Sequence, residues 1–360
     1  MVMSFWLMAD GWADKMGIKI EAKDSRVKNR ENLAERIPLP FPFVMYIEPT
    51  NICNFKCIFC PTGDKNLLKK VNRPAGFMKM KLYKKIIDDI KRSGYKLRLL
   101  SLYKDGEPLL NPDFPEMVRY ARDSKICDRI WTKTNGALLN PELNMKLVNC
   151  GLTWMGISVE AVSSEKYLKV SGAHLDYEKF KENIKDLYTR KNSDLHLYIK
   201  IADSGLSEEE KKKFYDDFSP ICDTIAIEKL MGWSYSSVKD FTLGLHPDTY
   251  DGLPFTEKDV CAYPFYVLAV NFNGSVSLCG NDWSHSTVVG NLNSDSILDI
   301  WNGENLYNFR KMFLTGNRCE NRACGDCYYL KIVPDNIDNN RDAILEKLTI
   351  QRNMINNKTS

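Results

Sequence analysis

Short apolar segments alternate with charged, amphipathic segments between residues 44 and 228, and this alternation constrains the fold more than any other feature of the sequence. The apolar segments have the length of buried strands, and the amphipathic segments have the period of helices. Strands that alternate with helices indicate an α/β protein with a parallel sheet, either doubly wound or barrel-like. The predicted strands are residues 44–48, 97–102, 129–134, 154–159, 195–201 and 224–228, and the predicted helices include residues 81–93, 114–124, 141–149, 177–191 and 207–218.

Three cysteines follow the first predicted strand in the spacing C-x3-C-x2-C: Cys53, Cys57 and Cys60. Thiolates at such spacing can converge on one soft metal centre, which is zinc, copper(I) or an iron–sulfur cluster. A closed structural zinc site needs four protein ligands, and the nearest downstream cysteine and histidine are Cys127 and His174. Three thiolates with an open position therefore favour a cluster with one free iron. A zinc knuckle or a chance group of cysteines is the alternative.

These cysteines, with the aromatic residue Phe59 before the last of them, resemble the signature of the radical S-adenosylmethionine (SAM) superfamily. The resemblance implies that Cys53, Cys57 and Cys60 hold a 4Fe–4S cluster whose free iron is chelated by SAM. In that family, electron transfer cleaves SAM to a 5′-deoxyadenosyl radical, which abstracts hydrogen from a substrate. The resemblance also implies a partial (β/α)6 TIM-like barrel, with the active site on the loops that follow the strands.

A second motif follows the second predicted strand and resembles the family's Gly-Gly-Glu-Pro sequence, whose backbone and glutamate bind the amino group of SAM. Gly106, Glu107 and Pro108 match it, whereas Asp105 replaces the first glycine. A carboxylate is a suitable acceptor for an ammonium group, so the resemblance implies that Glu107 contacts SAM. A Gly-Pro turn with a solvated glutamate is the alternative.

Polar residues follow the next strands. The Thr134-Asn135-Gly136 sequence resembles the family's turn near the cofactor, although Asn-Gly is also an ordinary turn former. Ser158 and Glu160 stand where polar residues of relatives contact the ribose and carboxylate of SAM. At the end of the fifth predicted strand, Lys200 and Asp203 are expected to form a buried pair rather than to contact a ligand.

The pattern changes after residue 260. Two short predicted strands, 265–272 and 275–279, are joined by Asn-Gly at 273–274, which is a strong hairpin signal. A helix is predicted near residues 297–314. Cys261 and Cys279 flank the hairpin, so the fold should bring their thiols together, and Cys324 and Cys327 follow the helix.

This second cysteine set resembles the auxiliary-cluster module of radical SAM enzymes that is called SPASM, or its shortened form, twitch. The resemblance implies that Cys261, Cys279, Cys324 and Cys327 hold one auxiliary 4Fe–4S cluster. Four cysteines are also a structural zinc set, which is the alternative. Cys319 is left over, and it could replace one ligand, stay free or serve as a hydrogen donor.

The expected domains are an N-terminal extension (1–42), a core barrel (43–230), a connecting segment (231–260), an auxiliary-cluster module (261–334) and a C-terminal tail (335–360) that is a polar helix or disordered. The net charge of +3 arises from 50 basic and 47 acidic residues, a balance that gives no reason to expect nucleic acid or a membrane as partner. Eleven cysteines without a recognisable export signal indicate metal or redox use in a reducing cytoplasm.

The expected function is oxidation or epimerisation of a small polar metabolite, such as a sugar or cyclitol, with SAM and two 4Fe–4S clusters as cofactors and a donor such as flavodoxin or ferredoxin. Modification of a ribosomally made peptide is an alternative. A non-catalytic iron–sulfur binding protein is another, and the Gly106-Glu107-Pro108 sequence argues against it. The substrate itself and the general base have no signal in the sequence.

Overall fold

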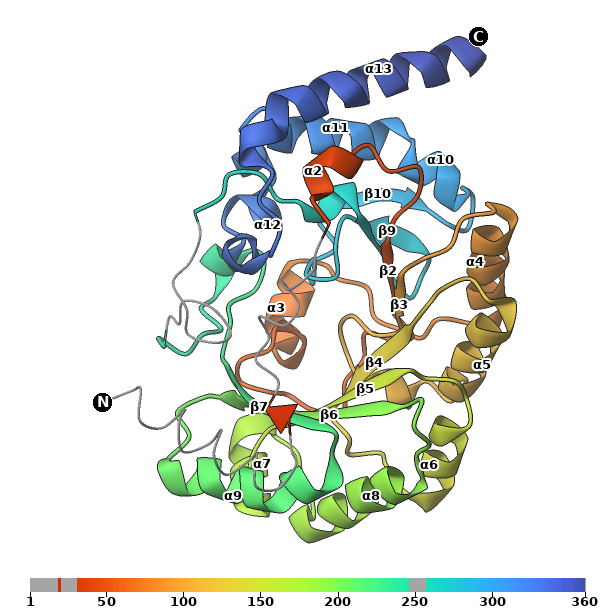
Figure 1. Ribbon diagram of the computed structural model, residues 1–360. Helices are drawn as coiled ribbons and strands as arrows, with labels where there is room; N and C mark the ends of the chain where they lie inside the picture. The colour runs from red at the N-terminus through yellow and green to blue at the C-terminus, as the bar shows by residue number, and fades with distance from the viewer. Residues whose placement is uncertain (1–18, 21–30, 246–256, 360) are drawn as a thin grey trace.

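The computed structural model describes residues 19–20, 31–245 and 257–359, and it is an α/β fold built on one mainly parallel sheet. The strands follow one another in the order β1-β7-β6-β5-β4-β3-β2-β8-β9-β10, and the sheet does not close on itself. It is therefore a partial barrel (Figure 1). The strands are β1 (Lys19–Ile20), β2 (Val44–Ile47), β3 (Leu99–Ser101), β4 (Ile130–Thr134), β5 (Trp154–Val159), β6 (His196–Asp203), β7 (Thr224–Lys229), β8 (Val267–Val270), β9 (Ser275–Ser277) and β10 (Val288–Asn291).

The predicted hairpin continues the barrel sheet. Strand β8 pairs in parallel with β2, with Val44 opposite Val267 and Ile47 opposite Val270. Strands β8 and β9 then pair antiparallel, and β10 adds antiparallel to β9. The C-terminal residues therefore share backbone hydrogen bonds with the first strand of the core.

Helices follow most strands and cover the outer face of the sheet (Figure 1). Helix α4 shows why they pack there: its 3.6-residue period places Tyr83, Ile86, Ile87 and Ile90 on one buried face. The helices are α2 (Leu33–Arg36), α3 (Lys65–Lys70), α4 (Met80–Arg92), α5 (Phe114–Ser124), α6 (Pro141–Val148), α7 (Ser164–Ser171), α8 (Tyr177–Arg190), α9 (Glu208–Phe218), α10 (Ile297–Trp301), α11 (Glu304–Leu314), α12 (Arg322–Gly325) and α13 (Arg341–Thr359).

The expected core elements agree with the structure within about two residues at each end. Helix α9 begins after Ser207, whose side chain caps the helix in a reciprocal arrangement with Glu210. The single helix expected at 297–314 is wrong, because it breaks into α10 and α11 at Asn302 and Gly303. A Cβ on Gly303 would lie 2.6 Å from the Asp299 carbonyl oxygen, so the chain turns tightly where glycine permits it.

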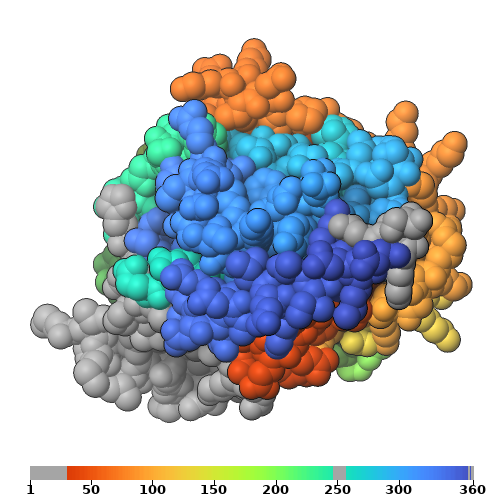
Figure 2. Space-filling model, turned by 90° about the horizontal axis from the view of Figure 1, so that it is seen from above, coloured from red at the N-terminus to blue at the C-terminus, as the bar shows by residue number. Residues whose placement is uncertain are grey.

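The C-terminal tail forms helix α13, which lies along α11. Arg352 of α13 donates a hydrogen bond of 2.8 Å to the carbonyl oxygen of Asn302. Figure 2 shows this helix, in dark blue, extending across the surface beside the red segment that contains α2. Within the described residues, we find no helix that combines the length and the apolar character needed to cross a membrane.

Candidate active site

The three-cysteine loop lies directly after β2, at the end of the strand where a parallel barrel carries its active site. Its backbone is held by the C-terminal end of α7: Lys56 donates to the Ser171 carbonyl at 2.7 Å, and Ile58 donates to the Val170 carbonyl at 3.0 Å. Cys53, Cys57 and Cys60 lie close enough that their charges act on one another. The structure therefore brings the three predicted ligands together.

Burial keeps these thiols protonated in the absence of a metal. It raises the pKa of Cys53 to about 12 and that of Cys60 to about 11, and it raises the pKa of Cys57 well above its usual value. Negative charge on neighbouring thiols adds to the shifts of Cys53 and Cys57, and the charge of Asp105 adds to that of Cys60. A cationic centre bound by the thiolates would counteract both effects, and such a site releases protons when it binds metal.

The turn after β3 packs against the backbone that leads into the cysteine loop. Gly106 has φ +79°, and a Cβ there would lie 2.6 Å from the carbonyl carbon of Asn51. The next residue, Glu107, donates its N–H to the Ile52 carbonyl at 2.9 Å. Glycine is therefore required here both for its backbone conformation and for the close approach, and Pro108 begins a 3₁₀ turn immediately after it.

The carboxylate of Glu107 is occupied by protein groups. It accepts hydrogen bonds from the Thr134 hydroxyl at 2.7 Å, from the Asn135 N–H at 2.6 Å and from the Leu109 N–H at 3.0 Å. Burial raises its pKa to about 7, and these hydrogen bonds oppose the shift. Glu107 thus joins the ends of β3 and β4, and a contact with SAM would have to share these oxygens.

Of the other residues predicted to contact SAM, Asn135 and Glu160 lie near the same loop. The Asn135 amide donates to Asn54 Oδ1 at 2.7 Å and lies 3.8 Å from the Cys53 sulfur. Glu160, whose pKa burial raises to about 7, acts electrostatically on all three thiols. Ser158 lies one residue from the end of β5, and the Phe59 carbonyl accepts a hydrogen bond from Trp233.

The second cysteine set lines one cavity. Cys261, Cys279, Cys324 and Cys327 all contribute to its wall. Burial raises the pKa of Cys261, Cys279 and Cys327 to about 12, and the pKa of Cys324 is raised further. Cys319 is exposed and is not among the residues that line this cavity, and its backbone packs against Gly325 beside Cys324.

The expected pair between Lys200 and Asp203 is wrong. The Lys200 ammonium instead binds the carboxylate of Glu228 on the neighbouring strand at 2.9 Å, and Asp203 binds Lys229 at 3.1 Å. The reason is register: Lys200 lies opposite Ala226 in the β6–β7 pairing, and Glu228 lies two residues further along on the same face.

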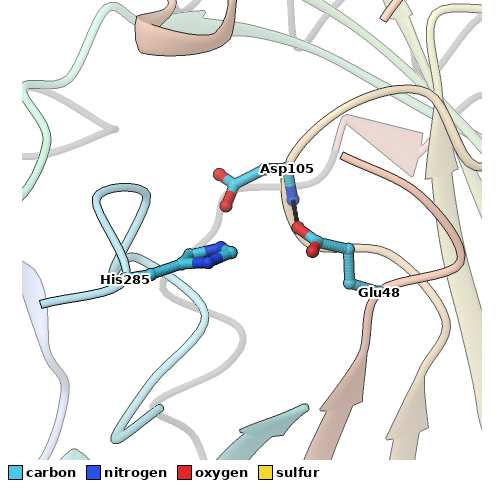
Figure 3. A group of neighbouring side chains, drawn as sticks. All are labelled: Glu48, Asp105 and His285. Atoms are coloured by element: carbon cyan, nitrogen blue, oxygen red, sulfur yellow. Dashed lines mark hydrogen bonds between the residues drawn. The ribbon is translucent and has the colours of Figure 1, made fainter. Parts of the chain in front are cut away.

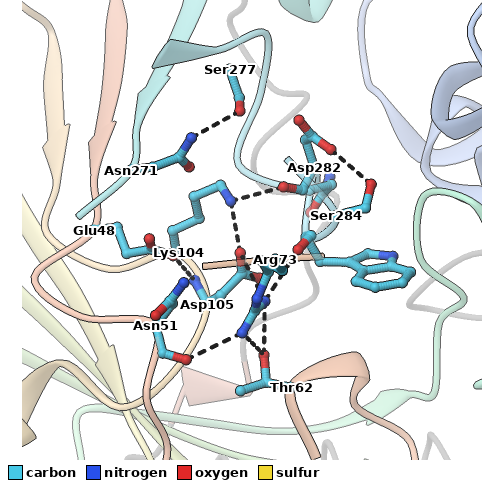
Figure 4. A network of polar contacts seen from close by, with 12 residues as sticks. Glu48, Asn51, Thr62, Arg73, Lys104, Asp105, Asn271, Ser277, Asp282 and Ser284 are labelled. Carbon is cyan, nitrogen blue, oxygen red and sulfur yellow. Dashed lines mark hydrogen bonds and ion pairs between the residues drawn. The ribbon is translucent and has the colours of Figure 1, made fainter. Parts of the chain in front are cut away.

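A buried network of charges, which the sequence analysis did not identify, acts on both cysteine sets. Figure 4 shows its side chains. Lys104 donates to the Asp105 carboxylate at 2.7 Å and to the Asp282 carbonyl at 2.9 Å. The Arg73 guanidinium lies 3.6 Å from the same Asp105 carboxylate. The charge of Asp105 acts on Cys60, and the charges of Asp282 and Lys104 act on Cys279. The only sign of this network in the sequence was Asp105, which replaces the first glycine of the family motif.

Comparison with protein families identifies the first half of this site. The radical SAM superfamily model matches residues 47–218, a range that includes the three-cysteine loop and the strands β3 to β6. The chain belongs to the radical SAM superfamily. A second model, that of the SPASM iron–sulfur cluster-binding domain, matches residues 261–328 and therefore includes all four cysteines of the cavity.

The curated relatives differ in what they do. This radical SAM chain is 28% identical over 49% of its length to an AdoMet-dependent heme synthase of Methanosarcina barkeri, of which it covers 46%. It spans less than half of the length of the heme synthase and of two further curated relatives that it matches. It is 23% identical over 78% of its length to the S-adenosyl-L-methionine-dependent 2-deoxy-scyllo-inosamine dehydrogenase of Niallia circulans, of which it covers 90%.

Solved structures support the fold. BtrN in complex with AdoMet and 2-DOIA superposes with a TM-score of 0.51 at 19% identity, over 80% of this chain and 93% of BtrN. Streptococcus suis SuiB bound to the precursor peptide SuiA superposes with a TM-score of 0.58 at 16% identity, over 87% of this chain and 78% of SuiB. At these identities the likeness concerns the fold alone.

Membership of the family implies SAM and a 4Fe–4S cluster, and the SPASM domain implies auxiliary iron–sulfur chemistry. The residues present fit both. Three thiols with no fourth cysteine in their loop leave one iron free for SAM, whereas four thiols around one cavity complete the ligand set of a second cluster. We therefore assign Cys53, Cys57 and Cys60 to the first cluster and the cavity cysteines to the auxiliary cluster as a proposal.

The hydrogen bonds of Glu107 lead to a prediction about stability and SAM binding. At pH 8, where its carboxylate is ionised, Glu107→Ala leaves three donors without their acceptor and should lower the free energy of unfolding by roughly 1.5–3 kcal/mol. SAM should also bind more weakly. Glu107→Gln, which keeps one acceptor oxygen, should lose less stability and less affinity for SAM. Urea denaturation and SAM binding by calorimetry measure both effects, and an alanine variant as stable as the parent would contradict this role.

Proposed function

We propose that this chain is a radical SAM oxidoreductase that takes a hydrogen atom from a small polar metabolite, such as a sugar or cyclitol, and oxidises it. When bound, SAM and its cluster supply the 5′-deoxyadenosyl radical that performs the abstraction. The chain's own residues position SAM beside the cysteine loop and surround the substrate with the buried charges that lie between the two cysteine sets.

The observation that carries the proposal is the cavity with four cysteines. A single set of four thiols fits one auxiliary cluster, which can accept one electron in an oxidation. One relative, of which this chain covers 90%, is a cyclitol dehydrogenase by name. The heme synthase relative is covered over a smaller share of its length and gives less support for its own substrate class.

The position of Cys319 favours oxidation over epimerisation. An epimerase needs a hydrogen donor inside the site, where it can quench the substrate radical from the opposite face. Cys319 is exposed and lies outside the four-cysteine cavity, so it is poorly placed for that task.

A ribosomally made peptide is the second candidate substrate. The superposition on SuiB with its precursor peptide, at a TM-score of 0.58, is the observation that favours it. The likeness concerns the fold, so it gives less weight to a peptide than the dehydrogenase relative gives to a cyclitol.

The electron donor we propose is an acidic one-electron carrier such as flavodoxin or ferredoxin. Helix α3 begins just after the cysteine loop and exposes Lys65, Lys69 and Lys70, and Lys56 is exposed within the loop itself. A basic surface beside the first cysteine set would attract an acidic carrier to the position from which electron transfer is shortest.

The test is an anaerobic incubation of reduced, cluster-loaded protein with SAM and 2-deoxy-scyllo-inosamine in deuterium oxide, followed by mass spectrometry in ordinary water. A dehydrogenase gives a product two hydrogens lighter than the substrate. A product one mass unit heavier than the substrate, with one deuterium on carbon, would instead show an epimerase. No conversion, with 5′-deoxyadenosine still formed, would reject the cyclitol. No 5′-deoxyadenosine under any condition would favour a non-catalytic iron–sulfur protein.

A further inference from the structure

A compact cluster of three side chains lies within the buried charge network. Glu48 follows β2, Asp105 follows β3, and His285 lies in the loop between β9 and β10. Their carboxylate oxygens and a ring nitrogen all lie within 4.8 Å of one another. Figure 3 shows the imidazole pointing toward the two carboxylates. The cluster therefore joins the mouth of the barrel to the C-terminal module.

His285 lacks the partners that its chemistry needs. Both ring nitrogens are buried, and neither has a hydrogen-bond partner among the residues that the structure describes. A neutral imidazole offers one donor and one acceptor, and burying both without partners is unfavourable. The residue as a whole is only partly buried, although its two ring nitrogens are not exposed.

The surrounding loop holds the ring in this place. His285 has φ +56°, a backbone conformation that is unfavourable for a side chain of this size. The carboxylate of Asp282 stabilises the loop by accepting bonds from the backbone N–H groups of Ser286 at 3.0 Å and Thr287 at 2.9 Å. Arg73 binds the Trp283 carbonyl at 3.2 Å. Strain that is maintained by so many contacts is typical of a functional position.

The charges around the ring argue against a metal ion as the missing partner. Lys104 and Arg73 already pair with Asp105. The pKa of His285 is lowered to about 4, mainly by burial and then by the positive charges of Lys104 and Arg73. Asp105 and Asp282 oppose that shift. A neutral imidazole beside two buried cations would bind a third cation poorly.

A hydroxyl group fits the cluster better. It can donate to one acceptor and accept from the imidazole N–H at the same time. Glu48 has acceptor capacity left, because its two oxygens receive only the N–H groups of Asp105 and Phe272 among the described contacts, whereas a carboxylate offers about four sites. Burial raises the pKa of Glu48 to about 7, so near neutral pH this group can also donate.

We propose that His285 and Glu48 form a subsite that binds a hydroxyl group of the substrate and fixes its orientation between the two cysteine sets. This inference rests on the proposed function, because it assumes a hydroxyl-bearing substrate. His285 is the specificity-determining residue, since one of its unpartnered ring nitrogens would pair with the hydroxyl. Asp105 is held beside it by Lys104 and Arg73.

Binding without turnover tests this proposal. We would titrate cluster-loaded, unreduced protein with SAM present, using 2-deoxy-scyllo-inosamine and, as an amine-free probe, myo-inositol, by anaerobic calorimetry. His285→Phe should weaken binding of both probes about tenfold, because the imidazole partner is lost. His285→Asn, which keeps a donor and an acceptor, should recover most of the affinity. His174→Phe makes the same change at an exposed histidine and should bind as the parent does.

Iron content is measured for each variant, so that a folding defect is seen directly. Parent-like affinity in a His285→Phe protein of normal iron content would overturn the subsite while leaving the proposed function in place. Failure of the parent to bind either probe would contradict the cyclitol substrate and the subsite together. Tight binding of Mn²⁺ to the parent, observed by electron paramagnetic resonance and lost in Glu48→Gln, would show that the cluster binds a metal ion and not a hydroxyl group.

Discussion

Replacing Cys53, Cys57 and Cys60 together by alanine should lower the iron content of anaerobically reconstituted protein from about eight to about four atoms per chain and abolish formation of 5′-deoxyadenosine. These are the three thiols that the structure gathers after β2, and their loop contains no other cysteine that could replace them. Iron analysis and chromatography of the SAM cleavage products measure the two effects.

Cys319→Ala is the matched control, because this cysteine is exposed and lies outside the four-cysteine cavity. It should keep about eight irons and full SAM cleavage. Stoichiometric zinc in protein isolated without oxygen, with no uptake of iron, would reject the cluster assignment. Iron that stays near eight in the triple variant would show that other residues hold the first cluster.

Replacing Cys324 and Cys327 together by alanine should remove the other four irons, stop product formation and leave slow, uncoupled formation of 5′-deoxyadenosine. The double change removes two of the four thiols of the cavity, whereas the residues around the first cysteine loop remain. An oxidation then lacks its acceptor for the second electron. Spectroscopy of the reduced protein should show one type of cluster instead of two.

The same assay on Cys261→Ala and Cys279→Ala provides the comparison. If the four cysteines hold one cluster, the Cys261→Ala, Cys279→Ala protein should lose iron and product formation as the Cys324→Ala, Cys327→Ala protein does. Undiminished product from the Cys324→Ala, Cys327→Ala protein would contradict the role of the cavity in oxidation. A zinc site in place of the cluster would show as one zinc per chain that disappears with the same pair.

The alternation of short strands and amphipathic helices predicted most of the core, because both patterns follow local periods that a single segment carries. Helix α5, for example, has the bounds that its sequence predicts. Strand β10 and helix α7 have weaker local patterns and were missed. The pairing of β8 with β2 was also missed, since it joins residues more than 220 positions apart and no local period encodes it.

The residues of the candidate site likewise fall into those that the sequence predicted and those that it did not. The cysteines could be found because metal ligands repeat at fixed spacings, and the structure brings each predicted set together. Glu48, Lys104 and His285 have no such spacing, because they come from three loops that only the fold brings together. Lys200 was assigned the wrong partner, since the choice between Asp203 and Glu228 depends on strand register.

The parallel pairing of β8 with β2 also has a consequence for the order in which the chain can fold. During synthesis, the first strand of the core emerges early, but the neighbour that covers its outer edge is made only when the ribosome reaches residues 267–270. Until then that edge presents unpaired N–H and C=O groups, which are available for pairing with other chains. Contacts of such long sequence separation close slowly. The nascent barrel therefore depends on its own C-terminal module for protection against aggregation, and the barrel and the module fold as one unit.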